Sequence, residues 1–374
     1  MKTKSNNPTY IFELALKASQ YNDYQLSFKY LCKCTDTISI EGIIASILLG
    51  ITTVSHDTIS THFPMLEKLS NDGYAIAQTN VAWCYQNSIG VERNDEKAFK
   101  YYKLAADQGY ANAQAALGYC YQNGIGVEQN YEEAFKYYKL AADKEFVIAQ
   151  HNLGWCYQNG IGVEQNCEEA FKYYKLSSDN KYVLGQIKLG YCYQHGIGIK
   201  QNSKKAFKYY KLAANQGYSK AEHNLGYCYQ KGIGIKQNQK KAFKHHKLAA
   251  YQENELSQTY LGYCYEKGIG VEQNCKEAFK YFKLAADQGY AEAQNYLGYY
   301  YHKGILVEQD NEKAFKDFKL AADKGNPDAQ INLAYCYEKG IGVERNYEES
   351  IKYNKLAANQ GHTSTKIYLS LLIK

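Results

Sequence analysis

Cysteine is the most reactive residue type that recurs at regular spacing in this 374-residue sequence. Seven of the 11 cysteines are separated by multiples of 36 residues, namely Cys84, Cys120, Cys156, Cys192, Cys228, Cys264 and Cys336. The Cys-x-x-Cys pair typical of zinc sites is absent, and Cys32-x-Cys34 is the nearest approach. The N-terminus contains no apolar signal segment, so we interpret the thiols as free and buried. We predict no metal site and no cofactor.

Two other motifs resemble catalytic or nucleotide-binding signatures. Ser178-Asp179-Asn180-Lys181 matches fragments of the serine β-lactamase signature, but it falls at a turn where other repeats read Asp-Gln-Gly. A nucleophilic serine also needs a pocket with a base and an oxyanion site. Gly124-Ile125-Gly126 lacks the preceding strand and the Lys-Ser/Thr pair of a phosphate loop. His245-His246 replaces a Tyr-Tyr pair of other repeats. We therefore predict that the chain is not an enzyme.

A 36-residue internal repeat predicts the elements that carry these residues. The segment 117–122, Leu-Gly-Tyr-Cys-Tyr-Gln, recurs with small changes at eight places. In each repeat a first helix, such as 111–123, ends at a glycine, which accepts the left-handed conformation. After a short loop, Asn130 caps a second helix that extends to about residue 143, with Glu133 at capping-box spacing. The sequence thus predicts an all-α chain of helix pairs.

A rotation of about 100° per residue sorts each helix into faces. The core face of the first helix holds Ala113, Leu117, Cys120 and Tyr121. The core face of the second helix holds Ala134, Phe135, Tyr138, Ala141 and Ala142. Gly118 lies at the flank of the first helix in a column that contains only Gly or Ala, so we expect a close approach of the neighbouring helix there.

Four short motifs within one repeat resemble the Sel1-like repeat, a slightly longer relative of the tetratricopeptide repeat. They are Leu-Gly-x-x-Tyr, Gly-x-Gly-Val, Ala-x-x-x-Tyr and Ala-Ala-x-x-Gly. The resemblance implies a right-handed superhelical solenoid of helix-turn-helix repeats that acts as a scaffold or adaptor for a protein or peptide partner. Some relatives sit beside kinase domains, which suggests a kinase or another signalling protein as the partner. Some bacterial relatives have been linked to penicillin binding, so a hydrolase of that type that uses Ser178 is kept as an alternative.

The repeat pattern divides the chain into three segments. Residues 73–361 form eight repeats, residues 1–72 are predicted to be a degenerate helical N-terminal cap, and residues 362–374 a C-terminal capping helix. Within the N-terminal cap, segments 41–54 and 63–71 resemble one degenerate repeat. The most apolar run, 43–51, is far shorter than the ~20 residues of a membrane helix. We expect no membrane association and a cytoplasmic or nuclear location.

One column of the first helix is aromatic in every repeat and lies opposite the core leucine. We call it the aromatic ladder; it consists of Trp83, Tyr119, Trp155, Tyr191, Tyr227, Tyr263, Tyr299 and Tyr335. The neighbouring amide column includes Gln122, Gln158, Gln194 and Gln230. By analogy with tetratricopeptide arrays, this face is predicted to line a concave groove that binds a peptide through ring contacts and amide hydrogen bonds. The alternative is that the rings pack on neighbouring helices of a tight superhelix.

Charge predicts a preference along the ladder and a second candidate surface. Acidic residues gather toward its C-terminal end, at Glu266, Glu292, Asp328 and Glu338, so we expect that half to prefer a basic ligand. Lysines recur in every repeat at the columns of Lys136 and Lys139, and we expect Glu132 to pair with Lys136. We interpret these columns as a solvated face. Anion or nucleic-acid binding through the lysine-rich segment 200–247 is the alternative, although a net charge of +6 does not require it.

Position 140 of the second helix is leucine in all eight repeats. This leucine column consists of Leu104, Leu140, Leu176, Leu212, Leu248, Leu284, Leu320 and Leu356. We expect lysine stems and neighbouring leucines to shield these side chains. The alternative is an exposed ridge for self-association. The sequence identifies neither the partner nor the oligomeric state.

Overall fold

The protein was analysed as a computed structural model, which describes residue 12 and residues 56–361. Within these residues it contains 17 α-helices and no strand. The predicted C-terminal capping helix lies outside the described residues, as does the N-terminal cap except for residues 12 and 56–72. There, α4 (His56–Asn71) begins before the predicted start at Phe63 and includes Pro64. No helix in the described part combines the length and apolar character needed to cross a bilayer.

Each repeat consists of one first helix and one second helix, as predicted. The first helices are α5 (Ala75–Asn87), α7 (Ala111–Asn123), α9 (Val147–Asn159), α11 (Val183–His195), α13 (Ser219–Lys231), α15 (Glu255–Lys267), α17 (Ala291–Lys303) and α19 (Pro327–Lys339). The second helices are α6 (Asp95–Asp107), α8 (Tyr131–Ala142), α10 (Cys167–Asp179), α12 (Ser203–Ala214), α14 (Gln239–Ala250), α16 (Cys275–Asp287), α18 (Asn311–Asp323) and α20 (Tyr347–Asn359).

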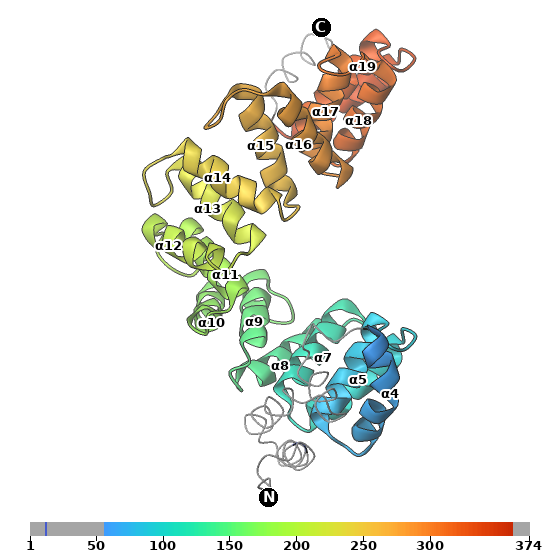
Figure 1. Cartoon of the computed structure of the whole chain (residues 1–374), viewed down its shortest axis with the longest axis vertical. Helices are drawn as coiled ribbons and strands as arrows, with labels where there is room; N and C mark the ends of the chain where they lie inside the picture. The colour runs from blue at the N-terminus through green and yellow to red at the C-terminus, as the bar shows by residue number, and fades with distance from the viewer. Residues whose placement is uncertain (1–11, 13–55, 362–374) are drawn as a thin grey trace, which may run out of the picture. The chain divides into compact units, whose positions relative to one another are not determined.

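The chain forms two compact parts whose boundary falls within α11 and the loop that follows it. In the N-terminal part α7 packs against α8, and α8 against α9. In the C-terminal part α17, α18 and α19 are stacked side by side in the same manner (Figure 1). Because each helix is covered by its neighbours in sequence, these helix pairs confirm the predicted all-α solenoid.

The ends of the helices follow from local sequence. Gly124 ends α7 with a φ of 67°, and the Asn130 side chain caps α8 by accepting a hydrogen bond from the Glu133 N–H at 3.0 Å. The reciprocal half of a capping box is missing. The backbone N–H of Asn130 instead donates to the Tyr121 carbonyl, and the Glu133 carboxylate pairs with Lys136.

The core of each repeat consists of small residues packed against one large ring. Leu117, Cys120, Ala134 and Tyr138 are fully buried. A Cβ atom on Gly118 would lie 2.8 Å from the Tyr138 ring, which confirms the predicted close approach. Two residues predicted in the core, Tyr121 and Phe135, are only half-buried. Tyr121 belongs to a strip of rings near the surface, in which it stacks on Tyr137 with centroids 5.7 Å apart.

The loop between the two helices of one repeat rests on the preceding repeat. A Cβ atom on Gly126 would lie 2.0 Å from the Asp95 carbonyl oxygen at the start of α6. Gly162 approaches Tyr131, and Gly342 approaches Asn311, in the same way. Glycine is favoured at this place for two reasons, because φ is also positive there.

Candidate functional site

The aromatic ladder is mostly exposed. Six of its eight rings have exposed fractions between 37% and 49%, namely Trp83, Tyr119, Tyr191, Tyr227, Tyr299 and Tyr335. Trp155 and Tyr263 are half-buried. Trp83, Tyr119 and Trp155 belong to the N-terminal part, and the five tyrosines belong to the C-terminal part. These exposures favour a surface that is free to bind over rings buried by neighbouring helices.

The amide column is oriented by tyrosines of the second helices. The Tyr138 hydroxyl donates to Gln122 Oε1 at 3.0 Å, and Tyr174 donates to Gln158 Oε1 at 2.8 Å. In the C-terminal part Tyr210 donates to Gln194 Oε1 at 2.9 Å. The amide oxygen is therefore already engaged, which leaves the amide N–H groups to donate to a ligand carbonyl.

The last four repeats depart from this arrangement. His246, Phe282, Phe318 and Asn354 stand where the earlier repeats have the donating tyrosine. The paired amide is present as Gln230, but Glu266, His302 and Glu338 replace it in the last three repeats. The last four repeats therefore lack the tyrosine hydroxyl that orients the amide column in the earlier repeats.

The acidic residues of the C-terminal repeats are partly neutralised. Glu266 pairs with Lys267 at 3.2 Å, and Glu338 pairs with Lys339 at 2.6 Å. Burial raises the pKa of Glu292, and the charge of Asp328 raises it further. The expected preference of this half for a basic ligand stays a prediction. The negative charge that these acidic residues present is smaller than the sequence alone indicates.

Four lysines of the Lys136 column, namely Lys136, Lys172, Lys280 and Lys352, form ion pairs within their own repeats, although not the predicted ones. Lys136 pairs with Glu133 at 3.0 Å, so the predicted pair with Glu132 is wrong. Where a lysine replaces that glutamate, its ammonium lies over a tyrosine ring, as Lys205 does over Tyr193. These contacts agree with a solvated face.

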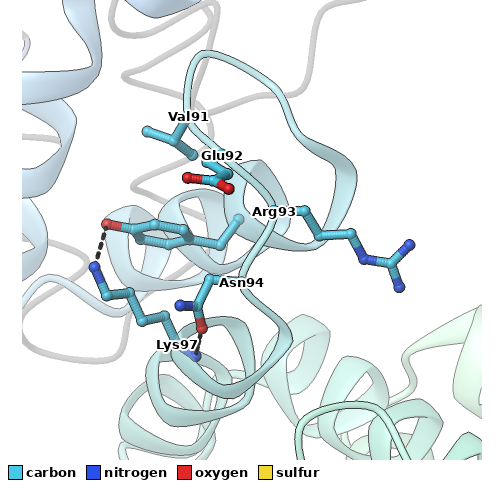
Figure 2. Close-up of a pocket in the computed structure, with 6 residues that line it drawn as sticks. Val91, Glu92, Arg93, Asn94 and Lys97 are labelled. Carbon is cyan, nitrogen blue, oxygen red and sulfur yellow. Dashed lines mark hydrogen bonds between the residues drawn. The ribbon is translucent and has the colours of Figure 1, made fainter.

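A pocket of about 410 Å³ lies in the first repeat, beside a lysine–tyrosine contact of the same kind. Its lining includes Tyr85, Glu92, Arg93 and Lys97. Figure 2 shows Arg93 directed away from the other labelled side chains, and Arg93 pairs with Asp95 at 2.9 Å. The Lys97 ammonium lies 5.0 Å from the Tyr85 ring centroid, the contact that other repeats also form. This pocket brings together no catalytic set.

The prediction that the leucine column is shielded is wrong. All eight leucines are exposed, with fractions between 39% and 42%. The helical wheel correctly placed these residues on the outer side of the second helices. The leucine column is therefore a second apolar surface that any binding experiment must control for.

The recurring cysteines belong to the core. All seven have exposed fractions of 0% or 1%. Burial raises the pKa of Cys84, Cys120, Cys156 and Cys228 to about 12, so these thiols stay protonated and unreactive. Over residues 56–361, no group of three or more His, Cys, Asp or Glu side chains is arranged to hold a metal ion.

The Ser178 turn serves the end of a helix. Ser178 is buried, and its carbonyl accepts the hydrogen bond that closes the turn at Lys181. The Asn180 side chain donates to the Leu176 carbonyl at 3.1 Å. These contacts explain the β-lactamase-like sequence without a catalytic role.

Sequence reasoning missed a cluster of histidines in the C-terminal part. The Ser257 hydroxyl lies 2.9 Å from His223 Nδ1 and 3.1 Å from His246 Nδ1. A third histidine, His245, contacts the Glu222 carboxylate at 2.7 Å. The serine and the carboxylate thus contact different histidines, and Ser257 is fully buried, so the cluster is not a hydrolytic triad. The unusual His245-His246 pair was the available signal.

Helix pairs that repeat at a fixed length and stack on their neighbours are the architecture of α-solenoid repeat proteins, and this chain has that architecture. The Sel1 repeat family matches eight segments of the chain: 75–110, 111–146, 147–182, 183–218, 219–254, 256–290, 291–326 and 327–362. The chain therefore belongs to the Sel1 repeat family, whose members generally act as scaffolds for protein–protein interactions.

Two solved structures resemble the whole array. One is a protective antigen present in uropathogenic Escherichia coli strains, which displays an SLR fold; it is 28% identical with a TM-score of 0.66, over 98% of this chain and 80% of that chain. The other is a Sel1 repeat protein from Oxalobacter formigenes, 27% identical with a TM-score of 0.60, over 83% of this chain and 90% of that chain. No match was found among curated proteins.

Proposed function

We propose that the protein is a non-enzymatic scaffold or adaptor that binds an extended or helical segment of a protein partner along the aromatic ladder. This face lines the concave groove, and the complex serves assembly or signalling, with a kinase or another signalling protein as the partner class. The observation that carries the proposal is the exposure of ladder rings at the same position of successive repeats. Rings supply contact area at low entropic cost, and the oriented amides supply donors.

The test is affinity capture from host-cell lysate with the full chain and two triple variants. The ladder variant carries Tyr227→Ala, Tyr263→Ala and Tyr299→Ala. The control variant carries Leu248→Ala, Leu284→Ala and Leu320→Ala, which removes exposed side chains from the second helices of the same repeats. Circular dichroism verifies that both variants retain their helices.

We expect the ladder variant to lose proteins that the wild type and the leucine variant both capture. Equal capture by the ladder variant and the wild type would remove the ladder as the binding site. Loss confined to the leucine variant would transfer binding to the leucine column.

A further inference from the structure

Position 138 holds a ring in seven of the eight repeats, and two arrangements of neighbouring groups recur around it. In the earlier repeats it is a tyrosine such as Tyr210, whose hydroxyl bonds to the amide column. His246 and Phe282 lack that hydroxyl, and a tyrosine of the next helix lies against each of them instead, tilted by 46° on His246 and stacked on Phe282. Tyr260 lies 4.2 Å from His246, and Tyr296 lies 4.4 Å from Phe282, between ring centroids.

Phe318 has neither arrangement. It lacks a hydroxyl, and the residue that corresponds to Tyr260 and Tyr296 is Asn332. Asn332 donates to Asn295 Oδ1 at 2.8 Å, and it has no ring to place beside Phe318, which is itself buried. His302, at the amide position, contacts Asn311 at 3.2 Å.

A pocket of about 170 Å³ lies at this place. Its lining includes the buried Phe318 and Cys336, together with Asn332 and two successive ladder rings, Tyr299 and Tyr335. A cavity of about 150 Å³ is large enough for one benzene ring. The imidazole of His302 and the ammonium of Lys303 complete the lining and can contact a polar atom on such a ring.

We infer that this pocket is the subsite for a tyrosine side chain of the bound partner. The inference rests on the proposed function, because it assigns one residue type to the segment that the ladder binds. The preceding repeat holds a tyrosine ring at the corresponding place within the chain, since Tyr296 stacks on Phe282 where Asn332 leaves a pocket beside Phe318. A phenol also retains a hydroxyl for Lys303 or His302 at the polar side of the pocket.

The experiment uses the full chain and a short peptide, Gly-Tyr-Gly with a 3-fluorotyrosine, followed by fluorine NMR line broadening. A single side chain is expected to bind with a Kd of about 1 mM. Asn332→Tyr recreates the Phe282–Tyr296 stack and fills the pocket, so it should weaken peptide binding at least about tenfold. Its thermal unfolding shows whether the variant is folded.

Asn332→Ala is the matched control, because it removes the hydrogen bond to Asn295 and leaves the pocket open. It should bind the peptide as the wild type does. Wild-type affinity in Asn332→Tyr, an equal loss in Asn332→Ala, or equal binding of a Gly-Leu-Gly peptide labelled on its leucine would overturn the tyrosine subsite. Capture lost in the ladder variant would still support the scaffold function in each of these cases.

Discussion

Leu306 shows how strongly one backbone position is constrained. It occupies the loop position that is glycine in the other repeats, with a φ of 64° and an exposed fraction of 50%. A side chain in the left-handed region costs about 1–2 kcal/mol relative to ordinary conformations. Half of Leu306 is exposed, so packing offsets only part of this cost.

We predict that Leu306→Gly raises the free energy of unfolding by about 1 kcal/mol, as measured by urea denaturation. The matched opposite change is Gly342→Leu in the next repeat, where a Cβ would lie 2.0 Å from the Asn311 carbonyl oxygen. That variant should lose roughly 2–4 kcal/mol. An unchanged unfolding midpoint in Leu306→Gly would argue against the strain.

For single residues, the sequence predicts the contacts of small side chains better than those of long side chains. The Gly/Ala column at Gly118 indicated a close helix approach because only those side chains fit beside the Tyr138 ring. The partner of Lys136 could not be predicted, because Glu132 and Glu133 lie four and three residues before it and both spacings allow an ion pair on a helix. The exposure of Leu140 was missed for a related reason, since a helical wheel gives a direction and not the residues that cover it.

The pair of helices α13 and α14 contains the histidine cluster, and its pH response belongs to the scale of an element. Burial lowers the pKa of His223 to about 4 and lowers that of His246 well below its ordinary value, and the neighbouring His223 and His245 lower it further. In the unfolded chain both histidines titrate near pH 6.5. The unfolded state therefore binds more protons as the pH falls, and stability is lost below about pH 6.5.

We predict that the free energy of unfolding falls between pH 6.5 and about pH 4. A triple variant, His223→Thr, His246→Phe and Ser257→Ala, copies the residues of the following repeat, namely Thr259, Phe282 and Ala293. It should fold with a smaller loss over this range. Burial raises the pKa of Asp317 to about 6, so that carboxyl opposes the trend in both proteins. Identical pH dependence in the two proteins would contradict a role for the cluster.

The helix pairs themselves were predictable because each carries its own signals. Asn130 and Gly124 bound the helices, and the 36-residue period specifies their number. The pocket beside Phe318 could not be predicted, because it depends on Asn332 standing where Tyr260 and Tyr296 place a ring in the two preceding repeats. The pattern becomes evident only when the packing of Tyr296 on Phe282 is known.

Stability in the whole molecule is expected to be local, because each helix packs mainly against its neighbours in sequence. We predict that Leu153→Ala, at a fully buried position of α9, costs roughly 2–5 kcal/mol. Hydrogen exchange followed by mass spectrometry should show faster exchange in α8, α9 and α10. Exchange in α17 and α18 should be unchanged, and acceleration along the whole chain would indicate a single cooperative unit.

The close contact of the loop glycines with the preceding repeat limits how such a chain can gain or lose residues during evolution. Gly126 fits against the start of α6, and Gly162 fits against the start of α8. The contact between one repeat and the next is therefore the same at both junctions. A segment of 36 residues can therefore be duplicated or deleted whole, and both new junctions remain complementary. Gain or loss of a single residue shifts the glycine from its seat. The geometry of this loop thus favours gain or loss of whole repeats over gain or loss of single residues.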